Sequence, residues 1–378
     1  MAKVVYYNPN TMGMCYDKGL HLACKLVRSH VPVDRSGKSN IFNISYQEIP
    51  KETKSLSFED SIINDAIYFW DKSKGKPITL FWSGGLDSTG VLFALKETMP
   101  IGQKLIIRFT KHAIVEYPWL HKEMLGWKSN NVILNQVDEW QLLRNLDDKS
   151  TMLLHCNAMD CIFGASNPWL QTRSVREVEK VLYSPWRTLE NWDIIWPISG
   201  DINAPKDLNL NKDKIKRLKL LCFLENHVLE LPFEIKTIQD LFWWVTFTIK
   251  WHYAQHSFVF NYLNDPRYYL HNDFSCGKNL QTWALLNRNT NHMGQGDSLK
   301  YKWVLRNFIF KYTKDEQYRD NKTKEKSIIP LNRVNAYPHI RTKLGDDKLK
   351  LVLDDGRYWY NKDDIPDDVM NDIKLNVL

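Results

Sequence analysis

The sequence predicts an α/β fold in which a parallel sheet has helices on both faces and is followed by a mainly helical region. Three observations support this prediction. Between residues 77 and 154, short apolar runs alternate with segments of good helix formers. The first run ends in two glycines and a Ser/Asp/Ser cluster, which is typical of a strand that turns directly into a helix. From residue 218 to residue 263 the chain is apolar and aromatic with helical spacing.

The expected elements of the first half follow in chain order. Before the sheet we expect a strand at residues 3–7 and a helix at 58–70, with Ser57 as its N-cap. The sheet region predicts strands at 78–82, 104–109, 132–134 and 152–154, with helices at 89–98 and 119–127. Because ligands of parallel sheets bind at the carboxyl ends of the strands, the connections after these strands are the candidate site.

The second half has weaker signals. Residues 167–213 contain several prolines and a Lys/Asn/Asp-rich stretch, which predicts a surface insertion. Residues 311–326 interleave basic and acidic side chains, which predicts a flexible or exposed segment. The tail predicts a hairpin with strands at 348–353 and 357–360, and then a short helix at 366–373.

Composition and charge restrict the function classes. The chain has 378 residues, 43% hydrophobic and 25% charged, as in ordinary globular proteins. Its 15 Trp, 17 Tyr and 16 Phe are expected mainly in the core. A net charge of +7 is mild for this length: it suits a nucleotide or another anionic ligand, whereas a dedicated duplex-binding surface is usually more basic. Nucleic acid is therefore not the favoured partner.

The cysteines and the apolar runs indicate a cytoplasmic protein without a membrane role. The six cysteines include no C-x-x-C pair and follow no secretory signal, so we expect reduced thiols. Cys156 and Cys161 have C-x₄-C spacing without a second ligand pair, which argues against a zinc site. The longest apolar run, residues 241–249, is too short to span a bilayer.

The stretch from Ile78 to Gly90 carries the strongest chemical signal. Its sequence places a strand, a glycine loop and a helix N-terminus in succession. Gly84 and Gly85 allow a sharp turn that directs several backbone N–H groups toward one point, where the helix dipole adds positive potential. Phosphate is the expected ligand of such a loop.

The loop sequence S-G-G-L-D-S resembles the SGGxDS signature of the PP-loop ATP pyrophosphatases, and the chain has no Walker-type G-x-x-x-x-G-K-[ST] motif. The resemblance implies an adenine nucleotide α-hydrolase-like fold and cleavage of ATP between its α and β phosphates. It also implies that the released pyrophosphate is held by five residues: Ser83, Gly84, Gly85, Asp87 and Ser88. A base bound in this orientation would rest near Phe109, after the second strand, although a packing role for Phe109 is an equal alternative.

A second motif follows the fourth strand. The segment from Asp160 to Gly164 resembles the D-E-L-F-G segment of the asparagine synthetase synthetase domain. This resemblance implies that Asp160, together with Asp87, holds Mg²⁺ against ATP oxygens. Members of that family usually have a glycine where Cys156 stands and a glutamate where Asn157 stands. The alternative role of Asp160 is a cap of the helix that is expected to begin near Cys161.

A third motif, from Lys302 to Arg306, resembles the K-x-[IV]-L-R helix start of asparagine and β-lactam synthetases. The resemblance implies that Lys302 is catalytic and neutralises charge on the α-phosphate and on the tetrahedral oxyanion. By itself, a lysine in a basic helix is usually only solvated. Its position after the two other motifs, in the order found in the family, favours the catalytic role.

Together these features predict four segments: an N-terminal part (1–57), the PP-loop core (58–200), a helical part that completes the synthetase domain (201–310) and a C-terminal extension (311–378). The resemblance, which runs from about Phe58 to Arg306, implies an AMP-forming carbon–nitrogen ligase. ATP and Mg²⁺ would activate a small-molecule acid as its adenylate, and an amine or ammonia would attack it. No glutaminase domain is expected, so ammonia would arrive directly or from a separate supplying partner.

Two alternatives remain open at this point. One is a PP-loop enzyme that modifies a nucleobase or a nucleic acid, although the paired cysteines common in thiolating members are absent. The other is a catalytically degenerate nucleotide-binding protein with a structural or regulatory role, which the residues Cys156 and Asn157 favour.

Overall fold

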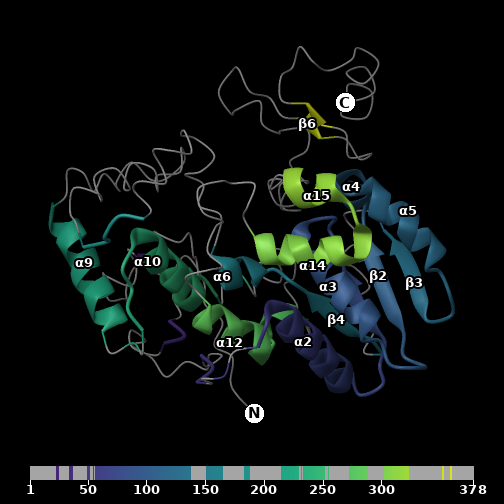
Figure 1. Ribbon diagram of the computed structural model, residues 1–378, viewed down its shortest axis with the longest axis horizontal. Helices are drawn as coiled ribbons and strands as arrows, with labels where there is room; N and C mark the ends of the chain where they lie inside the picture. The colour runs from purple at the N-terminus through teal and green to yellow at the C-terminus, as the bar shows by residue number, and fades with distance from the viewer. Residues whose placement is uncertain are drawn as a thin grey trace, which may run out of the picture. The chain divides into compact units, whose positions relative to one another are not determined.

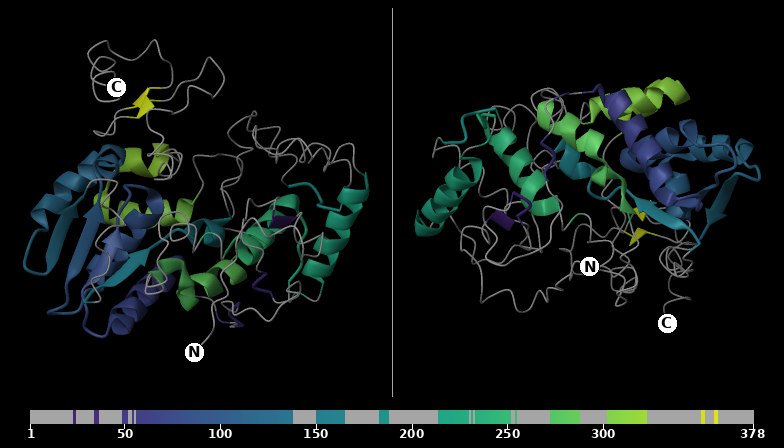
Figure 2. Two further views of the ribbon diagram at one scale, coloured as in Figure 1. Left: turned by 180° about the vertical axis from the view of Figure 1, so that it is seen from behind. Right: turned by 90° about the horizontal axis from the view of Figure 1, so that it is seen from below.

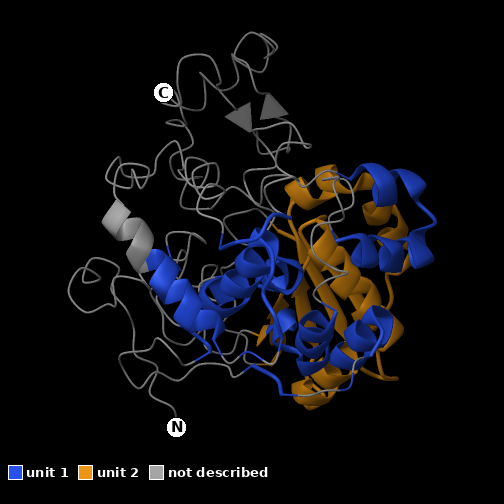
Figure 3. Ribbon diagram, turned by 60° about the vertical axis from the view of Figure 1, so that its left-hand side comes forward, with its two compact units in different colours: residues 1–65, 156–257, 273–323 blue, residues 66–155, 258–272, 324–378 orange. Residues whose placement is uncertain are grey.

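The computed structural model describes the parts of the chain on which the fold and the candidate site depend. These are residues 23–24, 34–36, 49–51, 54, 56–137, 150–164, 183–187, 214–229, 231, 233–251, 254, 272–287, 302–322, 351–352 and 358–359. They belong to two compact units, coloured in Figure 3. Unit 1 contains residues 1–65, 156–257 and 273–323, and unit 2 contains residues 66–155, 258–272 and 324–378.

The sheet of unit 2 is parallel and has β1 (Ile78–Phe81) at its centre. Three of its other strands are labelled in Figure 1. The strand order is β3-β2-β1-β4-β5, and the pairs β1–β2, β1–β4 and β2–β3 are parallel. The other strands are β2 (Leu105–Phe109), β3 (Val132–Gln136), β4 (Met152–His155) and β5 (Asn272–Asp273). Every residue of β1 and β4 is buried, which explains their continuous apolar sequences.

The helices of unit 2 follow the strands as the alternation predicts. They include α3 (Leu86–Glu97), α4 (Lys111–Glu116) and α5 (Pro118–Gly126), the first two of which pack against β1 and β2 respectively. Figure 2 shows the blue helices and strands of this region from two further sides. The expected helix at 119–127 is confirmed, with Pro118 at its first position, where a missing N–H costs nothing. The α4 helix was not predicted, because its six residues are too few for a periodic pattern.

Unit 1 is mainly helical. Its elements are α6 (Met159–Phe163), α9 (Lys214–Val228), α10 (Ile238–Val245), the π-helical segment η5 (Thr246–Lys250), the 3₁₀ turn η7 (Phe274–Cys276), α12 (Lys278–Leu286), α14 (Trp303–Thr313) and α15 (Glu316–Asn321). Helix α2 (Phe58–Ser73) is divided between the units at Asp65. Its predicted N-cap is confirmed, since the Asp60 N–H donates to Ser57 Oγ at 3.0 Å.

An aromatic cluster forms the part of the unit 1 core that supports the candidate site. The Phe58 ring lies 4.8 Å from Trp283, 5.8 Å from Phe163 and 6.2 Å from Phe308, measured between centroids. These four rings come from α2, α12, α6 and α14, and all four are buried. The prediction that the aromatic residues mainly form core is therefore confirmed for this cluster, which packs the end of α6 and the middle of α14 against α2 and α12.

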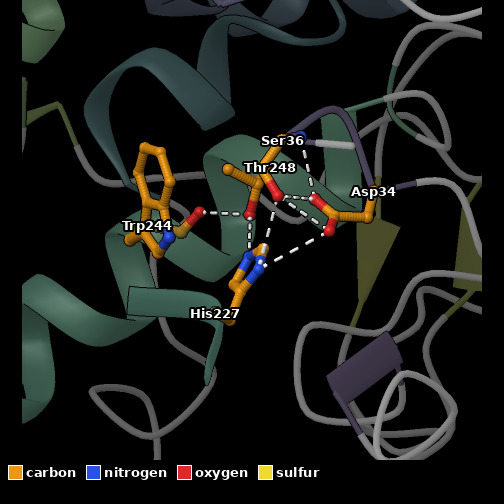
Figure 4. A network of polar contacts seen from close by, with 5 residues as sticks. All are labelled: Asp34, Ser36, His227, Trp244 and Thr248. Carbon is orange, nitrogen blue, oxygen red and sulfur yellow. Dashed lines mark hydrogen bonds and ion pairs between the residues drawn. The ribbon is translucent and has the colours of Figure 1, made fainter. Parts of the chain in front are cut away.

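A buried polar network connects three further segments of unit 1 (Figure 4). The His227 ring lies 3.5 Å from Asp34 through Nδ1 and 2.9 Å from Thr248 Oγ1 through Nε2. The Thr248 hydroxyl donates to the carbonyl oxygen of Trp244 at 2.7 Å, and Asp34 accepts from Ser36. An acid, an imidazole and a hydroxyl in series resemble a nucleophile relay. The Asp34 and His227 side chains have no exposed surface, so the network is structural.

The remaining expectations, most of which concern the C-terminal part, have different outcomes. The predicted hairpin is confirmed at β6 (Leu351–Val352) and β7 (Tyr358–Trp359), which pair antiparallel. The segment expected to be flexible or exposed, 311–326, is helical at 311–313 (the end of α14) and at 316–321 (α15); five of its residues from 311 to 321 are exposed, whereas Thr313 and Tyr318 are buried. The strand expected at 3–7 and the helix expected at 366–373 lie outside the described residues, as does most of the expected insertion at 167–213.

Within the described residues, the cysteines fit the expectation of reduced thiols. Cys24, Cys156, Cys161, Cys222 and Cys276 are free thiols. Burial raises the pKa of the Cys161 thiol to about 12, so this thiol is protonated near neutral pH. A search of the described helices finds none with the length and apolar character that crossing a membrane requires.

Candidate active site

Hydrogen bonds between Ser83 and Ser88 join the two ends of the loop that connects β1 to α3. Ser88 Oγ accepts from the Ser83 N–H at 3.1 Å and lies 3.0 Å from Ser83 Oγ. The first hydrogen bond inside α3 runs from the Thr89 N–H to the Gly85 carbonyl oxygen at 3.0 Å. The first N–H groups of a helix generally point out of its N-terminus, and here they belong to the residues that follow Gly85. This is the arrangement that binds anions at helix N-termini.

Gly84 is required at its position for two separate reasons. Its φ of +77° is in the left-handed region, which disfavours any residue with a Cβ. A Cβ at Gly84 would also lie 2.5 Å from the Ala113 carbonyl oxygen and 2.8 Å from Glu116 Cβ. Helix α4 therefore packs directly on the glycine loop, and only glycine leaves room for that approach.

The loop lies where ligands of open α/β sheets usually bind. In the order β3-β2-β1-β4-β5, the chain leaves β1 toward β2 on one side and later returns to β4 on the other side. Ligands of open α/β sheets usually bind at the carboxyl ends of the strands beside such a reversal point, which here lies between β1 and β4. The Ser83–Ser88 loop follows β1, and only residues 156–159 separate the end of β4 from Asp160.

Phe109 is placed in the core of unit 2. It is 2% exposed, and its ring makes edge contacts with Trp82 at 5.8 Å and His121 at 5.5 Å between centroids. These contacts fit the packing alternative for Phe109. Its contact with a nucleotide base stays a prediction.

Asp160 and Lys302 form a direct ion pair in unit 1. Lys302 Nζ donates to Asp160 Oδ1 at 2.7 Å and lies 5.5 Å from the centroid of the Phe163 ring. The Lys302 side chain is 2% exposed, whereas Asp160 is 26% exposed. The ammonium is thus enclosed, and the carboxylate is the member of the pair that faces outward. The two motifs, 142 residues apart, meet at this contact.

Buried contacts on both sides hold this pair. Asp273 Oδ2 accepts from the Ala158 N–H at 2.9 Å, which fixes the residue that precedes α6. Arg306, 1% exposed, donates through Nη1 to the Arg319 carbonyl oxygen at 2.7 Å and through Nη2 to that of Lys322. Arg306 thereby fastens the first turn of α14, which begins directly after Lys302.

Lys302 has an unusual backbone. Its φ of +57° and ψ of +37° are left-handed, which costs a residue with a side chain about 1 kcal/mol or more. Lys314, at the other end of α14, is also left-handed but is exposed. A left-handed lysine at a helix C-terminus is ordinary, whereas a left-handed and buried lysine at a helix N-terminus is held there by its surroundings.

The predicted metal carboxylates can be tested against the chemistry of Mg²⁺. The described residues contain no group of three or more His, Cys, Asp or Glu side chains that could enclose a metal ion. Mg²⁺ does not need such a cage, because it usually takes one or two carboxylates together with substrate phosphates and water. Asp87, in the first turn of α3 in unit 2, is a partly exposed carboxylate of this kind, and so, within unit 1, is Asp160.

The structure therefore divides the predicted residues into two groups. The five loop residues lie together in unit 2, and Asp160 and Lys302 lie together in unit 1. The sequence analysis missed two contacts: the Asp160–Lys302 pair itself and the packing of Glu116 on the glycine loop. No local signal announces either contact, since each joins segments that are distant in the chain.

Comparisons with known proteins add no relative. The chain matches no protein-family model, no curated protein and no solved structure. The interpretation of the site therefore depends on the motifs and on the geometry described above.

Proposed function

We propose that this protein is an ATP-dependent, AMP-forming carbon–nitrogen ligase of the PP-loop type, similar to the asparagine synthetase synthetase domain. The observation that carries the proposal is the SGGLDS loop. It has a left-handed Gly84, is closed by Ser83 and Ser88, and lies at the carboxyl end of the central strand β1. Loop, helix N-terminus and sheet position all favour phosphate binding.

The proposed reaction has two steps. A carboxylate oxygen of the acid attacks the α-phosphorus of ATP, the bond from that phosphorus to the bridging oxygen breaks, and pyrophosphate leaves with the bond electrons. The amine then attacks the acyl carbon, AMP leaves, and the new amide loses a proton to solvent. Adenylation is needed because oxide is a poor leaving group from a carboxylate, whereas AMP is a good one.

The chain's own residues would act on charge and position. Backbone N–H groups of the loop would hold the pyrophosphate oxygens, and the Lys302 ammonium would neutralise charge that develops at the reacting centre. Asp87 and Asp160 would hold Mg²⁺, which offsets the negative charge of the phosphates when bound. The left-handed backbone of Lys302 supports its role, since strain of this kind is often retained at functional positions.

The test is pyrophosphate release from ATP in the presence of Mg²⁺, mixed amino acids and ammonia. The natural protein should release pyrophosphate, and Lys302→Met should lower the rate by about 10²- to 10³-fold because an enclosed charge is lost. Lys314→Met is the matched control: it removes a left-handed but exposed lysine from the same helix and should leave the rate unchanged.

A second candidate function has one specific observation in its favour. Cys156 and Asn157 replace the glycine and glutamate usual in the family, and Asn157 is exposed beside the start of α6. A degenerate nucleotide-binding protein would show this pattern. Measurable ATP binding together with a persistent absence of pyrophosphate release would support that function and contradict the ligase.

A further inference from the structure

Glu116 is the acidic side chain that packs on the glycine loop of unit 2. A Cβ built on Gly85 would lie 3.6 Å from Glu116 Oε1, and one on Gly84 would lie 3.2 Å from Glu116 Cγ. The Glu116 side chain is 11% exposed, so it is enclosed at this position by its neighbours. The other carboxylate oxygen, Oε2, lies 3.7 Å from Nε2 of His112, one turn earlier on α4.

This placement creates an electrostatic conflict for the proposed ligand. Gly85 is the N-cap of α3, and the N–H groups that would hold pyrophosphate belong to the residues directly after it. A carboxylate within a few ångströms of that point repels phosphate in a partly buried setting, where the repulsion is weakly screened. A site built only to bind phosphate would not keep an enclosed carboxylate there.

The conflict disappears when a divalent cation binds together with the phosphates. Mg²⁺ prefers carboxylate and phosphate oxygens and is commonly held by one or two carboxylates plus the substrate.

Resting on the proposed function, we infer that the carboxylate of Glu116, which lies beside Gly84 and Gly85, binds the divalent cation that accompanies the ATP phosphates. It makes the loop selective for metal-bound over metal-free phosphate. His112, beside Oε2, is a positioning residue that holds the carboxylate against Gly84 and Gly85.

The test measures the affinity of inorganic pyrophosphate and of α,β-methylene ATP by calorimetry, each with Mg²⁺ and with EDTA. In the natural protein Mg²⁺ should strengthen binding. Glu116→Gln should weaken binding about tenfold in Mg²⁺, because a cation ligand is lost, and strengthen it about tenfold in EDTA, because a repelling charge is lost. Glu123→Gln is the charge-matched control, since Glu123 is exposed on α5 and should change neither affinity.

Glu116→Gln should change the binding affinity in opposite directions in Mg²⁺ and in EDTA, and this distinguishes the inference from simpler roles of Glu116. A packing residue would weaken binding equally with and without Mg²⁺, and a mere repelling charge would strengthen binding in both; either result overturns the inference. Glu116→Asp covers the case in which the glutamine variant does not fold. It keeps the charge but withdraws it by one methylene, so binding should weaken in Mg²⁺ and stay weak in EDTA. Equal affinity of the aspartate variant and the natural protein in Mg²⁺ also overturns the inference.

Failure of the proposed function gives a different result. If the natural protein binds neither ligand with or without Mg²⁺, the phosphate loop itself is disproved, and with it the role of Glu116. If the natural protein binds both with Mg²⁺ dependence that Glu116→Gln leaves intact, only the inference about Glu116 fails.

Discussion

Substitution of Gly84 by alanine tests the packing of α4 on the loop, on which both proposals depend. The chain offers a matched control in Gly102, which has nearly the same left-handed backbone, with φ of +81° against +77°. A Cβ at Gly102 has no neighbour within 4 Å, whereas a Cβ at Gly84 would lie 2.5 Å from the Ala113 carbonyl oxygen. Both glycines belong to unit 2, so the two variants differ mainly in the contact.

The expected loss of stability follows from the left-handed backbone, which both variants share, and from the steric contact, which only Gly84→Ala introduces. Each alanine adds a left-handed residue with a Cβ, at about 1–2 kcal/mol. Gly84→Ala also forces side-chain or backbone movement in a packed region, at about 1–3 kcal/mol more. The two variants should therefore differ by about 1–3 kcal/mol in the free energy of opening of unit 2, which corresponds to roughly 5- to 150-fold in an equilibrium constant.

Hydrogen exchange of the β1 and β2 amides measures this difference, because it reports on unit 2 without requiring the whole chain to unfold in one step. Exchange in Gly84→Ala should exceed exchange in Gly102→Ala by the factor above. Equal exchange rates in the two variants would refute the reasoning, since they would show that α4 does not pack on the loop.

Two further predictions concern the stability of unit 1. Burial raises the pKa of Asp65 from 3.8 to about 6, against the opposing hydrogen bonds from Leu280 and Asn279. The folded protein therefore holds this proton more tightly than the unfolded chain, so the contribution of Asp65 to stability is fully present below pH 4 and is lost as the pH rises through 6. It amounts to roughly 3 kcal/mol, and Asp65→Asn should remove this part of the pH dependence in urea titrations between pH 4 and 7. In the buried network, Thr248→Val should lower the free energy of unfolding by about 1–3 kcal/mol, because His227 Nε2 loses its hydrogen-bond partner. Thr248→Ser keeps the hydroxyl and should therefore retain most of the stability. Equal urea midpoints for the valine and serine variants would contradict this prediction.

Local sequence was sufficient for most of the sheet region. Strands β1, β2, β3 and β4 lie within a residue or two of their predicted positions, because each is a short apolar run bounded by turn or helix signals. Helix α3 begins at Leu86, three residues before the predicted start, because Gly85 rather than the Ser/Asp cluster provides its N-cap. Ends of elements depend on such single contacts and are harder to predict than their existence.

Two other helices, α12 and α15, were missed for different reasons. Helix α12 has no capping side chain of its own at Gly277, and Asp65, more than 200 residues earlier, accepts from the Asn279 and Leu280 N–H groups instead. Helix α15 has a local cap, Asp315, which accepts from the Tyr318 N–H at 2.8 Å. Its alternating charges suggested an exposed segment, but the burial of Tyr318 decides its structure.

The sequence by itself determined the chemistry of the candidate site: a glycine loop between strand and helix, an aspartate after the fourth strand and a lysine before a late helix. Only the tertiary structure decided which of these groups meet. It joins Asp160 to Lys302 across 142 residues and leaves the ammonium enclosed. It also places Glu116 against Gly84 and Gly85, because helix α4 packs where both glycines lack a Cβ. Motifs specify residue types by local patterns, whereas contacts between distant segments arise from packing, which no local pattern contains.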